Sequence, residues 1–198
     1  MKILMVLTSH RQLGDIGKTA SFSFNEFAAS YYFFKDAGAN ITVVWSSGST
    51  PISGPVSDAP DLQTDATRRF ELDAFAQQVL DQAGMFASVS TSHFDAVSYP
   101  SRHAPLRNLA DGAIAAKLIE SKANEVKTAV AERHSSGVLR LAEVADICQL
   151  PNRKRVFGFA SSVKASVSFI DIAPLLVDNM RVKNGGVHSK GADWLPYA

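Results

Sequence analysis

Apolar runs alternate with segments of helical periodicity along the whole chain. Short, nearly continuous apolar runs are typical of strands that are buried on both faces of a sheet. They occur at Lys2–Thr8, Ile41–Trp45, Phe94–Tyr99, Val126–Ala131 and Arg155–Phe159. Because helical segments separate these runs, the pattern predicts an α/β fold with a mostly parallel central sheet and helices on both of its faces.

The helices are predicted from apolar residues that recur every three or four positions. The first such face comprises Phe24, Phe27, Ala28, Tyr31 and Phe34, in a helix that ends near Gly38. Further helices are predicted with the face Leu72, Phe75, Ala76 and Val79, over Ala110–Glu120, with the face Val138, Leu141, Ala142 and Ala145, and from Pro174 to Val182. Ser46–Pro60 is rich in Ser, Gly and Pro, which predicts a loop.

Composition narrows the class of protein. With 198 residues, 46% of them hydrophobic, the chain is long enough for one domain with a substantial core. A net charge of +1 favours neither nucleic acid nor an acidic membrane surface as a partner. Cys148 is the only cysteine, and no apolar run reaches the roughly 20 residues that span a bilayer. We therefore expect a cytoplasmic protein, with no secretory signal peptide.

Two segments carry the candidate chemistry, and each follows a predicted strand. The first is Tyr99–Leu106 and the second is Arg133–Leu139, which passes directly into the predicted helix. A sharp strand-to-helix turn is the layout of a nucleophile elbow, in which the apex residue attacks the substrate. Here the apex is Arg133, which stays protonated and has only hydrogen-bond donors. The five histidines are scattered along the chain, so no metal site is predicted.

These segments resemble the ThiJ/PfpI superfamily, which has the class I glutamine amidotransferase-like fold, and in particular its bacterial branch of glyoxalase III and heat-shock chaperone proteins. The similar segments are Lys2–Ser9, Glu26–Ala29, Tyr99–Leu106 and Ser189–Tyr197, in the order of the family. The resemblance implies a flavodoxin-like three-layer sandwich over residues 1–198, with residues 46–90 as a helical cap insertion beside the active site. The last strand and helix of the family are not found after Tyr197.

The resemblance also implies a site. The family's elbow carries Cys-His, and a glutamate of the first helix hydrogen-bonds the thiol, without any cofactor. Glu26 matches that glutamate, His134 matches the histidine, and Arg133 stands where the cysteine would be. The family's Gly-Gly-His-Gly segment corresponds to Ser101, Arg102, His103 and Ala104, and the family's third acidic partner corresponds to Lys164.

Arg133 has more than one interpretation. It is either a degenerate position or the centre of an anion-binding pocket with Arg102, His103, His134 and Lys164, because arginine binds carboxylates and phosphates well. Glu26 could instead pair with Arg133 and close the pocket. Taken without the resemblance, Glu26 would be a solvated residue of a helix surface, and Ser135 a helix cap rather than a substitute nucleophile.

Three functions follow from the resemblance. The first is a protein that is inactive as a cysteine enzyme and acts in binding, in a holdase role or in stress. The second is a cofactor-independent lyase or hydrolase of small carbonyl compounds that uses His134 and Glu26, with Arg133 as electrophile. The third is a decaying paralogue without a selected function. The predicted partners are a small carbonyl or anionic ligand and a second copy in a homodimer, with no nucleic acid and no membrane.

Overall fold

The computed structural model describes residues 1–8, 24–46, 63–100, 113–125, 128–131, 143–144, 148–149, 155–156, 183, 185 and 187–188. Its main elements are β1 (Lys2–Leu7), α1 (Phe24–Asp36), β2 (Asn40–Trp45), α2 (Asp65–Leu72), α3 (Ala74–Asp81), β3 (Gly84–Met85), β4 (Ala96–Tyr99), α5 (Ala113–Asn124) and β5 (Thr128–Ala131). Two 3₁₀ turns, Phe86–Ser88 and Thr91–His93, lie between β3 and β4. The short strands β6 (Glu143–Val144), β7 (Cys148–Gln149), β8 (Arg155–Val156) and β9 (Val187–His188) follow.

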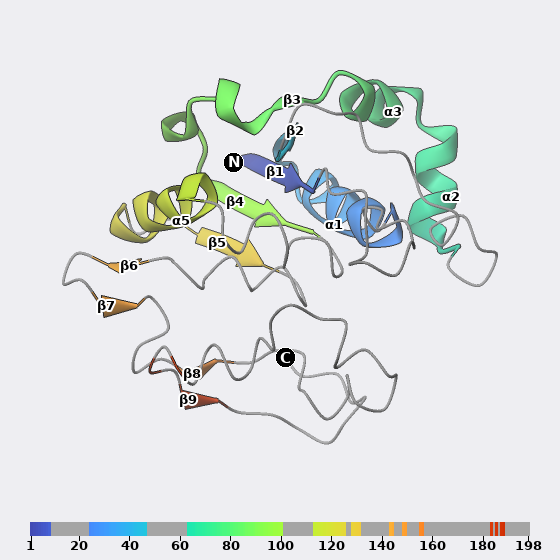
Figure 1. The fold of residues 1–198 in the computed structure, drawn as a ribbon. Helices are drawn as coiled ribbons and strands as arrows, with labels where there is room; N and C mark the ends of the chain where they lie inside the picture. The colour runs from blue at the N-terminus through green and yellow to red at the C-terminus, as the bar shows by residue number, and fades with distance from the viewer. Residues whose placement is uncertain are drawn as a thin grey trace, which may run out of the picture.

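The centre of the molecule is a five-stranded sheet in the order β3-β2-β1-β4-β5, in which every neighbouring pair is parallel (Figure 1). β1 is the middle strand, and Ile3, Leu4, Met5 and Leu7 on it are fully buried. A strand that is buried on both faces has no polar face to alternate with, which is why the run reads as continuously apolar.

Helices cover the two faces of the sheet. Met5, Leu7, Val43 and Trp45 share a core cluster with residues of α1, α2 and α3, whereas Leu4, Val6, Val44 and Val97 share the other cluster with Leu118 and Ile119 of α5. Successive strand residues point to opposite faces, so neighbours such as Leu4 and Met5 belong to different clusters. The predicted flavodoxin-like α/β sandwich with a mostly parallel sheet is confirmed.

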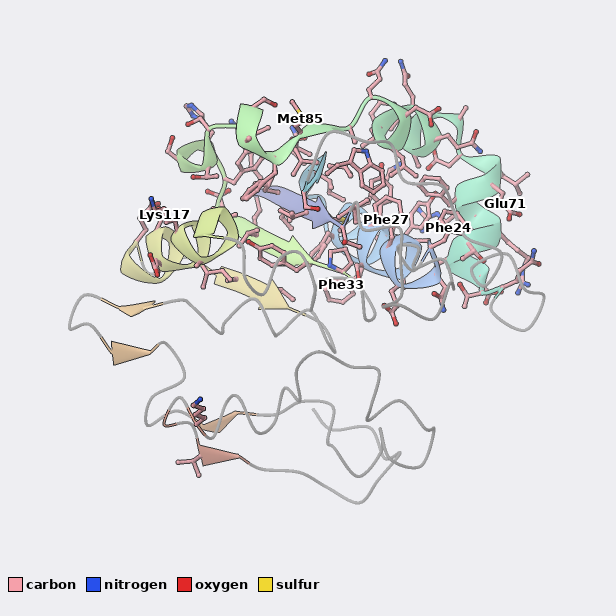
Figure 2. The ribbon with its side chains drawn as sticks, viewed as in Figure 1. Phe24, Phe27, Phe33, Glu71, Met85 and Lys117 are labelled. Atoms are coloured by element: carbon pink, nitrogen blue, oxygen red, sulfur yellow. The ribbon has the colours of Figure 1, made fainter. Side chains whose placement is uncertain are left out.

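The predicted helix at Phe24–Phe34 is confirmed as α1. Phe27 and Ala28 are fully buried, and Phe24 and Phe27 lie on the side of α1 that faces α2 (Figure 2). The helix ends at Asp36, near Gly38 as predicted. The φ of Gly38, +77°, is left-handed, and its N–H donates to the carbonyl of Lys35 at 2.9 Å. Glycine adopts this conformation at little cost, which makes it the usual end of a helix.

Three predictions along the chain are wrong. The face Leu72, Phe75, Ala76 and Val79 does not belong to one helix, because α2 and α3 are separated at Asp73 and the side chains of Leu72 and Phe75 are exposed. The helix predicted through Leu141, Ala142 and Ala145 is interrupted by β6, which pairs antiparallel with β7. Finally, Arg155–Val156 pairs with Val187–His188 in a separate two-stranded sheet instead of joining the main one. The helix predicted from Pro174 to Val182 lies outside the described residues.

Polar contacts fasten α3 to α1 through Asp73, the residue between α2 and α3. Its Oδ2 accepts hydrogen bonds from Lys35 Nζ at 2.9 Å and from Tyr32 OH at 3.1 Å. The neighbouring contact joins Arg69 of α2 to Asp36 of α1 through two hydrogen bonds of 2.7 and 2.8 Å. The Arg69 guanidinium also lies 3.9 Å from the ring centre of Tyr32.

These contacts predict acid sensitivity. The Lys35 ammonium, the backbone N–H of Ala76 and the Tyr32 hydroxyl together lower the pKa of Asp73 from 3.8 to about 2. Because the pKa is lower in the folded state, the stabilisation is fully present above pH 3.8 and is lost as the pH falls towards about 2. We expect the free energy of unfolding, measured in urea, to fall less steeply between about pH 4 and pH 2 in Asp73→Asn than in the unchanged protein. Equal slopes would contradict the prediction.

Candidate active site

The strand order predicts a ligand site at the carboxyl end of the sheet. The chain proceeds outward from β1 to β2 and β3, then returns to β4 on the other side of β1 and continues to β5. In open α/β sheets, ligands bind outside the carboxyl ends of the strands at the point where this order reverses. That point lies between β1, which ends at Leu7, and β4, which ends at Tyr99.

Glu26 lies at the carboxyl end of the sheet, in the first turn of α1. β1 runs towards the carboxyl end of the sheet, and α1 is the next described element along the chain. The helix packs on the sheet beside Met5 and Leu7. The side chain is buried, at 8% exposure, next to the fully buried Phe27 and Ala28. A carboxylate in the first turn is stabilised by the partial positive charge of a helix N-terminus. Burial rules out the interpretation of Glu26 as a solvated residue of a helix surface, while its part in a site stays a prediction.

The strands that lead to the two predicted segments end side by side. Tyr99, the last residue of β4, is paired with Ala131, the last residue of β5. In the sequence, Ser101 follows Tyr99 by two residues and Arg133 follows Ala131 by two residues. The predicted site residues Ser101, Arg102, His103, Arg133, His134 and Lys164 lie outside the described residues.

Tyr99 itself is fully buried at the end of β4. Its ring belongs to the core cluster on the α5 face, with Leu4, Val6 and Leu118. Burial raises the pKa of the Tyr99 hydroxyl well above that of free tyrosine, because the phenolate would lose its hydration. The Tyr99 side chain is therefore a neutral group whose ring packs in the core beneath the end of β4.

Sequence reasoning missed Ser98, which is completely buried in the middle of the sheet. It is paired with Met5 of β1 and Val130 of β5, on the face of the sheet that α1 covers. Within the part of the chain that the structure describes, its Oγ has no hydrogen-bond partner. A serine inside an apolar run gives no signal of its own, because a small residue is tolerated there for packing alone.

Among the residues that the structure describes, no cluster of three or more His, Cys, Asp or Glu side chains could hold a metal ion. Among these same residues, no helix is both long enough and apolar enough to cross a membrane.

No family profile and no curated protein sequence matches the chain. Solved structures do match. Rapid Encystment Protein 24 kDa (REP24) of Francisella tularensis superimposes with a TM-score of 0.90 at 20% identity, covering 99% of this chain and 86% of that protein. Glyoxalase III of Candida albicans gives 0.86 at 16% identity, covering 96% and 83%. A ThiJ/PfpI domain protein of Brachyspira murdochii gives 0.56 at 14% identity, covering 96% and 79%.

At these identities the likeness shows the fold. The chain has the fold of the ThiJ/PfpI and DJ-1-like proteins, as the resemblance of its sequence segments implies.

Proposed function

We propose that this protein is a ThiJ/PfpI-superfamily member related to glyoxalase III, and that it binds a small carbonyl or anionic ligand without cysteine chemistry. The observation that carries the proposal is the buried carboxylate of Glu26 at the carboxyl end of the sheet. This is the end at which β4 and β5 also finish, side by side. A carboxylate at that place matches the glutamate of the family's site, and the similar solved structures include glyoxalase III of Candida albicans.

The proposal that cysteine catalysis is lost rests on the sequence. Thiolate attack on an aldehyde needs a cysteine at the elbow, and the chain has Arg133 at that position and its single cysteine at Cys148. Cys148 lies in β7, paired with Val144 of β6. A guanidinium cannot replace a thiolate as a nucleophile, although it binds anions through up to five donors.

The alternative function is catalysis by a different route. His134 and Glu26 would then transfer the proton and Arg133 would polarise the carbonyl oxygen of the substrate, in a lyase or hydrolase acting on small carbonyl compounds. Glu26 is buried in the first turn of α1 and not on a solvent-exposed helix surface, as this role requires. The holdase role, the homodimer and the cytoplasmic location stay predictions.

Turnover of methylglyoxal to lactate by the purified protein distinguishes the two functions. We expect no turnover above that of a heat-denatured control, because the nucleophile is absent. Arg133→Cys is expected to restore turnover if the rest of the site is intact. Turnover by the unchanged protein that is abolished in both His134→Ala and Glu26→Gln would contradict the main proposal and support the alternative. A thermal melt of each variant shows whether a lost activity reflects a lost fold.

A further inference from the structure

Asp73 is the one residue between α2 and α3, and its backbone serves both helices. Its N–H donates to the carbonyl of Phe70 at 3.1 Å and so closes α2. Its Oδ1 accepts the N–H of Ala76 at 3.0 Å and so caps the N-terminus of α3. Asp is among the preferred N-cap residues because its side chain satisfies a backbone donor that the helix leaves unpaired.

The same carboxylate also ties the junction to α1. Its Oδ2 accepts from both Lys35 and Tyr32, so one side chain joins α3 to α1, while the backbone of Asp73 closes α2. Phe75, on α3, adds a second link, since its ring centre lies 5.3 Å from Lys35 Nζ. Gln77 of α3 donates from Nε2 to the carbonyls of Phe70 at 3.1 Å and Glu71 at 2.7 Å, which fixes the angle between α2 and α3.

The two helices differ in how much apolar surface holds them. α2 inserts Phe70, at 4% exposure, into the aromatic cluster of α1. The fully buried residue of α3 is Ala76, a single methyl group, while Phe75 on the same helix is 64% exposed. Val79 and Leu80 of α3 pack against the same cluster but are only partly buried. Because α3 buries no aromatic ring, it depends more than α2 on the polar contacts of Asp73.

α3 leads into β3, which covers one edge of the sheet. β3 pairs with β2 through Val44 and Trp45. Trp45 is 5% exposed and belongs to the same core cluster as Ala76, against which Val79, Leu80 and Ala83 also pack. Residues 74–85 therefore form a cover over Trp45 and over the outer edge of β2.

We infer that residues 74–85 act as a flap that opens as one unit while the rest of the sheet stays folded, and that the Asp73 carboxylate holds it closed. Local opening of units with few buried apolar contacts is a general property of folded proteins. When the flap opens, Trp45 and the backbone of β2 at Val44 and Trp45, which β3 otherwise pairs with, become accessible to solvent.

Quenching of Trp45 fluorescence by acrylamide tests the flap in a Trp194→Phe background, which leaves Trp45 as the single tryptophan. In Asp73→Ala we expect Trp45 to become at least about threefold more quenchable. We also expect amide exchange over residues 74–85 to be about 10-fold faster, while β1 and β4 keep their protection. Asp73→Asn should give a smaller increase, since Asn still caps α3 but loses the ion pair with Lys35.

Arg68→Ala is the matched control, because it removes an exposed ion pair with Asp65 on α2 without touching the junction. It should leave quenching and exchange unchanged. Where Asp73→Ala does not fold, Asp73→Asn and Lys35→Met carry the test, and both should raise Trp45 quenching. Unchanged quenching in the folded variants would overturn the inference. Loss of protection in β1 and β4 together with residues 74–85 would also overturn it, because Asp73 would then support the whole fold.

Discussion

Phe70→Ala is expected to destabilise the protein by about 3–5 kcal/mol, the usual cost of removing a buried aromatic ring. Phe70 is the residue through which α2 enters the core. Its ring packs at centroid distances of 5.2 Å from Phe24, 5.5 Å from Phe27 and 6.1 Å from Tyr31, with near-perpendicular planes. Edge-to-face pairs of this kind add to the stabilisation from burial, so one substitution removes three ring contacts and leaves a cavity between α1 and α2.

The measurement is urea unfolding at neutral pH, and Leu72→Ala is the control on the same helix. Leu72 is 88% exposed, so its truncation should change the free energy of unfolding by no more than about 0.5 kcal/mol. A cost below about 1.5 kcal/mol for Phe70→Ala would show that the aromatic cluster closes around the missing ring.

The contrast between Phe70 and Leu72 shows where sequence reasoning went wrong on this segment. The spacing of Leu72, Phe75, Ala76 and Val79 favours one continuous helix, and period alone contains no signal for a break. Asp73 contains that signal, since Asp stabilises a helix start better than a helix interior. Once the helix breaks there, the two halves turn different residues inward, and Leu72 and Phe75 become exposed.

Strands with long, buried runs were predictable from the sequence. β1, β2, β4 and α1 agree with their predictions within two or three residues, because each places apolar side chains where the fold buries them. β6 and β7 were not predictable in this way. Each has only two residues, and their ladder depends on the pairing of Val144 with Cys148, which is a property of the tertiary structure and not of either segment.

Of the candidate site, only the helix and strands that surround it could be predicted from the sequence. The family resemblance placed Glu26 in the first helix, and the structure buries it there. The parallel pairing of β4 with β5, which brings the two strand ends together, follows from the same fold. The resemblance gave no indication of the buried Ser98 between Met5 and Val130, because a small residue inside an apolar strand has no pattern of its own.

Among the residues at the strand ends that lead to the predicted site, Tyr99 should be the most sensitive to substitution. Tyr99→Ala is expected to lower the free energy of unfolding by about 3–5 kcal/mol. The side chain is fully buried among Leu4, Val6 and Leu118, and the backbone is the last rung that joins β4 to β5. Removing the ring therefore opens a cavity directly beneath the two strand ends from which the predicted site segments continue.

Tyr99→Phe distinguishes the contribution of the buried ring from that of the hydroxyl. It keeps the packing volume, so we expect a cost of no more than about 1.5 kcal/mol in urea unfolding, the size of one hydrogen bond.

Hydrogen exchange shows where each variant is destabilised. Tyr99→Ala should raise exchange first at Thr128–Ala131. Phe70→Ala, with a similar total cost, should leave that strand protected and affect α1 and α2. If both variants deprotect the same strands, the two faces of the sheet unfold as one unit, and Tyr99 has no local effect on the site. If they differ, Tyr99 holds the end of β4, the strand from which the predicted segment Ser101–His103 continues in the sequence.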